Sequence, residues 1–170
     1  MPTSQSVIYD ADAWTRWVPA APFGAWLCHL AAATGLEPTT IAVAAGVPIS
    51  VGRRLAQGDY QHHRIRMLDA KSLMALDAEK LQQMGARLTD SGIARRALND
   101  LGLWRPDAQT LAERLGVSID VAQGLLNGWL VTCPMSVIWH CLALTQDIVH
   151  ARTLTAYWPN AQTEPAAVAA

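Results

Sequence analysis

Two adjacent arginines and a glutamine stand near the end of the stretch IAVAAGVPISVGRRLAQG, which begins at Ile41. Arg53, Arg54 and Gln57 carry planar hydrogen-bonding groups that can read base edges in the major groove of DNA. A good bidentate arginine–guanine pair contributes about 1–3 kcal/mol of discrimination against other bases. On a helix over residues 49–57 these side chains are expected to face outward. Two further residues are expected on the same face, where they would contact thymine methyl groups, phosphates or another chain: Ile49 and Ser50.

A basic loop follows this stretch. His62, His63, Arg64 and Arg66 lie within eight residues of its final glycine, and we expect them to contact the flanking phosphates. The histidine pair does not predict a metal site, because adjacent histidines in one loop rarely converge on one ion and no third ligand is evident. An ordinary loop is the alternative reading of these four residues.

The same stretch occurs a second time, seventy residues further along the chain. LAERLGVSIDVAQGLLNG, which begins at Leu111, aligns with it without gaps. Each copy predicts a helix, a tight turn at glycine and a second helix, which is the helix-turn-helix motif. We expect Gly46 and Gly116 to adopt positive φ at the turn, where a β-carbon costs energy. Ala42 and Ala112 would lie where the two helices cross closely, because only a small side chain fits there.

Both copies resemble the helix-turn-helix of repressor-type DNA-binding proteins. Over roughly residues 18–150 the tandem pattern, with VPAAP ahead of the first copy and GARLTDSGIARRALNDLGLW between the two, is similar to a family of small tandem helix-turn-helix proteins of actinobacteria and their phages. The resemblance implies DNA binding, in transcriptional control, and implies no ligand. The chain departs from the pattern at Gly52 and Ala122, where a buried valine or isoleucine is usual. Gly52 lowers helix propensity by about 1 kcal/mol relative to alanine, so a tilted or less rigid helix is expected there.

The two copies differ on their outward faces. The expected outward residues of the second copy include no cation: Ser118, Ile119, Asp120, Gln123, Gly124 and Asn127. Gln123 and Asn127 can read adenine, but the electrostatic attraction that dominates DNA affinity is missing. Arg95 and Arg96 are the nearest compensation. We therefore expect the second copy to serve packing, dimerisation or weaker DNA contact.

The distribution of charge favours the first copy in the same way. The net charge of the whole chain is −1. Residues 38–76 carry five basic side chains and two acidic ones, whereas residues 104–152 carry three basic and four acidic. A surface that attracts phosphates is therefore expected in the first half only.

The predicted fold is all-α, with two tandem helix-turn-helix units of about four helices each. The expected segments are an N-terminal arm over 1–22, a first unit over 23–82, a second unit over 83–158 and a disordered tail over 159–170. In the first unit we expect one helix to stop at Gly35 and the next to start near Pro38. No convincing strand is predicted, although DYQHHRIR and WLVTC could form short extended pieces.

Other classes of function find less support in the sequence. No apolar run reaches the roughly 18 residues that span a bilayer, and no signal peptide is evident. No catalytic arrangement or phosphate-binding glycine loop stands out, so we expect no enzyme activity, no cofactor and no metal. Three cysteines without CxxC spacing indicate reduced thiols and a cytoplasmic protein. Two minor alternatives stay open: a haem, zinc or redox site on one face of a helix at Cys133, His140 and Cys141, and a partner or ligand pocket at Trp129 and Trp139.

These patterns predict a cytoplasmic transcriptional regulator that binds double-stranded DNA through its first unit. Because one unit carries few cations, it should bind DNA weakly. We therefore expect a homodimer, or help from a protein of the transcription machinery. The alternative is a protein-interaction module, in which a degenerate helix-turn-helix scaffold has little DNA affinity. The near-zero net charge and the lack of a cation on the second helix of the second copy motivate it.

Overall fold

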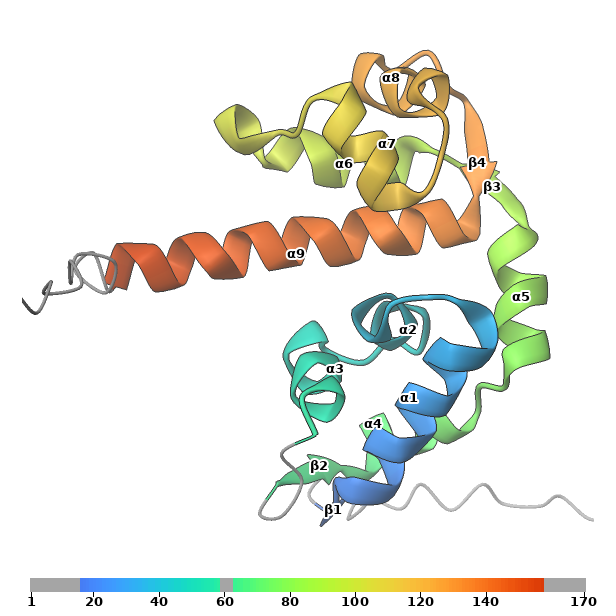
Figure 1. Ribbon diagram of the computed structural model, residues 1–170, viewed down its shortest axis with the longest axis vertical. Coiled ribbons are helices and arrows are strands. Elements are labelled where there is room, and N and C mark those ends of the chain that lie inside the picture. The colour runs from blue at the N-terminus through green and yellow to red at the C-terminus, as the bar shows by residue number, and fades with distance from the viewer. Residues whose placement is uncertain (1–15, 59–62, 158–170) are drawn as a thin grey trace, which may run out of the picture. The chain divides into compact units, whose positions relative to one another are not determined.

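The computed structural model describes residues 16–58 and 63–157, and the side chains of those up to residue 150 (Figure 1). These residues are mostly helical and include two small two-stranded sheets. The chain divides into two compact units, Met1–Arg87 and Leu88–Ala170. The boundary predicted between residues 82 and 83 falls inside helix α5 (Ala78–Ala86), which belongs to the first unit.

Unit one, Met1–Arg87, is built from helices around a short antiparallel strand pair. Strands β1 (Trp17–Pro19) and β2 (Arg64–Arg66) pair with Val18 opposite Ile65. Helix α1 ends at Gly35, whose φ is 73°, and helix α2 begins at Pro38, as the sequence predicted. Its helices are α1 (Ala21–Thr34), α2 (Pro38–Ala44), α3 (Ile49–Ala56), α4 (Met67–Met74) and α5.

Unit two, Leu88–Ala170, repeats the order of unit one from its first strand to the helix after its second strand, and has no counterpart of α5 among the described residues. Strands β3 (Leu88–Asp90) and β4 (Thr132–Pro134) pair antiparallel, with Thr89 opposite Cys133. A short 3-10 turn, η2 (Gly102–Trp104), follows its first helix. Its long last helix packs against the first one of the unit and touches the second (Figure 1). The helices are α6 (Gly92–Asp100), α7 (Ala108–Leu115), α8 (Ile119–Asn127) and α9 (Met135–Tyr157).

Each unit contains a matching backbone hydrogen bond between its first helix and the segment before its second strand. The amide of Ala20 donates to the carbonyl of His63 at 3.0 Å, and the amide of Ser91 donates to that of Val131 at the same distance. These bonds tie the start of the first helix to the strand that follows the third. The strands β2 and β4 lie in the two segments for which the sequence allowed extended structure, whereas β1 and β3 were not predicted.

A glycine in the left-handed region joins the second and third helices of each unit. Gly46 has a φ of 70° and Gly116 a φ of 64°, which confirms the positive φ expected at both turns. Directly after each glycine a valine amide donates back to an alanine carbonyl, Val47 to Ala42 at 2.8 Å and Val117 to Ala112 at 3.1 Å. The turn is therefore closed in the same way in both units.

Helices α2 and α3 approach each other closely at a pair of small residues. Ala42 and Gly52 are both buried. A β-carbon placed on Gly52 would lie only 2.5 Å from the β-carbon of Ala42, far inside the 3.5–4.0 Å at which carbon atoms attract. Gly52 therefore permits the crossing, and α3 runs through it without interruption. Ala122 occupies the matching position of α8 and is fully buried.

Among the described residues, no helix is both long enough and apolar enough to cross a membrane.

The close crossing of α2 and α3 predicts that Gly52→Ala lowers stability, although helix propensity alone would favour alanine. Gly52→Ala should gain about 1 kcal/mol from propensity, but its β-carbon must displace that of Ala42, and overpacking of this kind costs typically about 1–3 kcal/mol. We expect a net loss in the free energy of unfolding, measured by urea denaturation. The control is Ala42→Gly/Gly52→Ala, which exchanges the two side chains and should be more stable than the sum of the single changes predicts. Additive effects, or a stabilised Gly52→Ala, would contradict the close crossing.

Candidate nucleic-acid interface

The outward face of α3 carries polar and basic side chains. Ser50, Arg54 and Gln57 are exposed and Arg53 is half-buried. The Nε of Arg54 donates to the carbonyl oxygen of Ser50 at 3.3 Å, which lays the side chain along the helix. Four of the residues predicted to contact DNA therefore lie on or beside one accessible surface of α3.

Ile49 was expected on this face, and that expectation is wrong. Its side chain is only 4% exposed. Ile49 is the first residue of α3 and lies three positions before Gly52 and six before Leu55, so all three share the face that packs into the core. Ile49 anchors the start of α3 and is not available to a partner.

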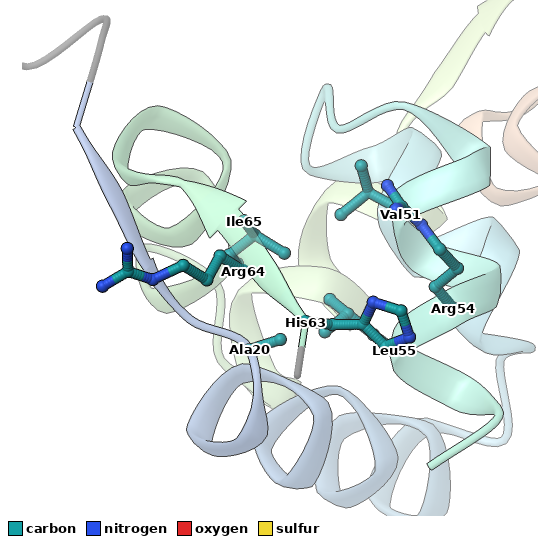
Figure 2. A pocket seen from close by; sticks show the side chains of 7 residues that line it. All are labelled: Ala20, Val51, Arg54, Leu55, His63, Arg64 and Ile65. Atoms are coloured by element: carbon teal, nitrogen blue, oxygen red, sulfur yellow. The ribbon is translucent and has the colours of Figure 1, made fainter. Parts of the chain in front are cut away.

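The basic residues after α3 lie on β2. Arg64 and Arg66 are exposed on either side of the buried Ile65, as strand alternation requires. His63 is half-buried, and Figure 2 shows its ring between β2 and α3 while Arg64 extends away from that space. His62, also predicted to contact DNA, lies outside the described residues.

A groove of about 160 Å³ separates the start of α3 from the strand pair. Residues from four elements line it: Pro48, Ser50, Val51 and Arg54 at α3, Arg64, Ile65 and Arg66 on β2, Trp17 on β1, and Asp69 on α4. A smaller apolar recess shares several of these residues and is bordered by Ala20, Leu55 and His63 (Figure 2). Three arginines, one aspartate and one tryptophan are therefore among the residues that border the same hollow.

Trp17 and Asp69 were not predicted to belong to a site. Trp17 is half-exposed and lies directly opposite Arg66 in the strand pair. Its partner strand is more than forty residues away in the sequence, so no local pattern reveals the pairing. The alternation Arg-Ile-Arg of β2 was the available signal that a half-buried strand was present.

The matching face of α8 has a different surface. Gln123 and Asn127 are exposed as predicted, as are Ile119 and Asp120. Gly124, which occupies the position of Arg54, was expected to face outward, but it is buried. A β-carbon there would lie 3.0 Å from the β-carbon of Leu130 and 3.2 Å from the ring of Trp129. The chain folds back after α8, since the amide of Leu130 donates to the carbonyl of Gly124 at 3.1 Å.

Arg95 makes a structural hydrogen bond within unit two. Its guanidinium donates to the carbonyl of Gly128 at 2.8 Å, at the C-terminal end of α8. A cation stabilises the unpaired carbonyls and the negative end of the helix dipole at this point. Two arginines were expected to compensate for the lack of a cation on α8. Arg95 is hydrogen-bonded to Gly128, and Arg96 is exposed.

The three cysteines lie in different environments. Cys28 is exposed, whereas Cys133 and Cys141 are buried in the core of unit two. Burial, reinforced by the nearby Cys133, raises the pKa of the Cys141 thiol to about 12, and burial also raises the pKa of Cys133. Cys133 lies on β4, before α9 begins, so it does not share a helix with His140 and Cys141. Within residues 16–58 and 63–157 no group of three or more potential ligands could hold a metal ion.

Comparisons of the chain with protein-family models, with curated proteins and with solved structures find no match. The resemblance to tandem helix-turn-helix proteins therefore stays a prediction from the sequence.

The cysteine environments predict selective thiol reactivity. Alkylation proceeds through the thiolate, so Cys28 should react rapidly at neutral pH, while Cys133 and Cys141 should react only on unfolding. Mass spectrometry after brief labelling should therefore show one modified cysteine in the native protein and three in urea. Cys28→Ser is the control and should show none under native conditions. Rapid native labelling of Cys141 would instead support a thiol switch in unit two.

Proposed function

We propose that unit one is a helix-turn-helix domain that binds double-stranded DNA and regulates transcription in the cytoplasm, and that unit two is a second copy of the same motif. The observation that carries the proposal is the outward face of α3, where Arg54 and Gln57 are exposed beside Arg53. The turn at Gly46 and the buried opposite face of α3 support the motif, because they leave only this face accessible.

The proposed complex places α3 in the major groove. Arg53, Arg54 and Gln57 would read base edges, since guanidinium and amide groups match guanine and adenine. Arg64 and Arg66, on the exposed side of β2, would contact phosphates beside the groove. Each phosphate contact releases condensed counterions, so affinity should fall steeply with salt.

Unit two would contribute packing, dimerisation or weaker DNA contact. Its α8 keeps Gln123 and Asn127 accessible, but Asp120 would face phosphates and Trp129 covers the position of Arg54. A homodimer would present two copies of unit one to DNA and would offset the small number of cations on each.

DNA titration with matched double variants tests the proposal. Arg53→Ala/Arg54→Ala should weaken binding to short duplexes at low salt by at least tenfold, because each bidentate contact of an arginine with a base contributes about 1–3 kcal/mol. Arg96→Ala/Arg114→Ala removes the same charge from exposed positions of unit two and should have a much smaller effect. Fluorescence anisotropy with random and genomic duplexes provides the measurement.

Two results would count against this function. Wild-type protein that does not bind any duplex at low salt would eliminate it. Equal losses in the two double variants would show that binding depends on overall charge and not on α3.

A second candidate function is a protein-interaction module, and the surface of unit two favours it. Large apolar side chains are exposed on several of its elements: Leu88, Ile93, Leu103, Trp104, Ile119, Trp129, Val131 and Val149. Exposed apolar surface of this kind is frequent at sites of protein association. The partner would be a second copy of the chain or a protein of the transcription machinery.

If unit two carries a homodimer interface, Leu103→Ser should weaken it. Leu103 is fully exposed, so the change should not disturb folding, but it removes apolar surface that a partner would cover. Sedimentation equilibrium should then show a dimer for the wild type, and the dimer of the variant should already dissociate at higher protein concentrations. Met74→Ser, at an exposed methionine of unit one, is the control. A wild-type monomer at high concentration would exclude the homodimer.

A further inference from the structure

The groove between α3 and the strand pair combines groups that α3 alone does not offer. From the residues that line it, we infer that it binds an unpaired nucleotide of a DNA strand next to the duplex held by α3. The inference extends the proposed function, because Arg54 borders both surfaces. It assigns unit one a preference for duplex DNA that adjoins single-stranded DNA.

An accessible aromatic ring stands at one wall of the groove. Trp17 is 50% exposed although it belongs to a strand pair, and its register partner is Arg66. An indole presents a flat π-face on which any nucleobase can stack, and such stacking is a general device of single-strand binding. In duplex DNA the faces of the bases are covered by their neighbours, so this contact requires an unpaired base.

Basic side chains border the same space. Arg54 on α3 and Arg64 and Arg66 on β2 all line the groove. Guanidinium groups bind phosphate through paired, charge-assisted hydrogen bonds. A base stacked on Trp17 would therefore have two cationic partners for its phosphate, Arg54 on α3 and Arg66, which lies opposite Trp17 in the strand pair.

One carboxylate in the groove argues against a simple anion site. Asp69, in the first turn of α4, lines the groove with the three arginines. A carboxylate repels phosphate but accepts hydrogen bonds from the N–H groups of bases, which are amino groups in adenine, guanine and cytosine and the ring N3–H in thymine. The ligand that suits the whole set carries an anion, hydrogen-bond donors and an aromatic face, and a nucleotide has all three.

The size of the groove limits the ligand. Its volume of about 160 Å³ is below the roughly 300–1,000 Å³ of pockets that enclose drug-sized molecules. One base fits this description better than a dinucleotide does. A free mononucleotide shares the chemistry, but the adjoining face of α3 favours a nucleotide that belongs to a bound strand.

The test uses the full chain and three DNA probes. The first is a blunt random-sequence duplex, the second the same duplex with a short thymidine overhang, and the third the same duplex with an abasic overhang of equal length. The abasic overhang carries the same phosphates without bases, so it separates stacking from charge. We expect the thymidine overhang to raise affinity about tenfold over the blunt duplex and the abasic overhang to raise it much less.

Variants of exposed tryptophans identify the ring that stacks. Trp17→Ala should abolish the gain from the thymidine overhang and leave blunt-duplex affinity within about twofold, whereas Trp17→Phe should keep most of the gain. Trp104→Ala removes a similarly exposed indole from unit two and should change neither affinity. Circular dichroism of each variant confirms that the fold is retained. Competition by free thymidine monophosphate that removes the gain at millimolar concentration would show that the groove also accepts a nucleotide from solution.

The outcomes separate this inference from the proposed function. Blunt-duplex binding without any gain from the thymidine overhang overturns the inference and leaves the proposed function intact. Equal gains from thymidine and abasic overhangs, or a gain that survives Trp17→Ala, also overturn it. A gain that depends on Trp17 in a protein that ignores blunt duplexes would support the groove and contradict the role given to α3.

Discussion

The close crossing of α2 and α3 is the contact on which the rest of unit one depends. Gly52 lies against Ala42 with no room for a β-carbon, and the turn between the helices is closed by Gly46 at positive φ. Because this contact fixes the rotation of α3, it determines which side chains enter the core and which remain accessible. Ile49 and Leu55 point inward for this reason, and the arginines lie at the surface beside β2. A small change at the crossing should therefore alter the outward face as well as stability.

Local sequence rules predicted the turns and several helix boundaries of the chain well. The positive φ at the turn glycines and the helix boundaries at Gly35 and Pro38 follow from the chemistry of those residues alone. The orientation of Ile49 was missed because a helix of eight residues can be rotated by one position without violating a short pattern. The strands β1 and β3 were missed because each pairs with a segment more than forty residues away. For the same reason the candidate site lacked Trp17, which only the strand pair brings beside Arg66.

The two units show how one framework can support different surfaces. Both keep the strand pairing, the turn and a buried small residue where the helices cross. Their outward faces differ at several positions, and at one of them Arg54 of unit one corresponds to Gly124 of unit two. Because Gly124 has no side chain, the ring of Trp129 can lie against α8. Arg95 separately donates to the carbonyl of Gly128 at the end of that helix. The turn and the small residues at the helix crossing were predictable from the repeated residues. The strand pairing was not, and the position of Trp129 depends on how the chain reverses after α8.

The proposal as a whole assigns nucleic-acid contact to one side of unit one. Backbone amide shifts during titration of isotopically labelled protein with a short duplex report contact residue by residue, without any substitution. The account predicts perturbations that concentrate on Ser50–Gln57 of α3 and on Arg64–Arg66 of β2, with small changes over α8. Perturbations centred on Ile119–Asn127, or no perturbation at low salt, would contradict it.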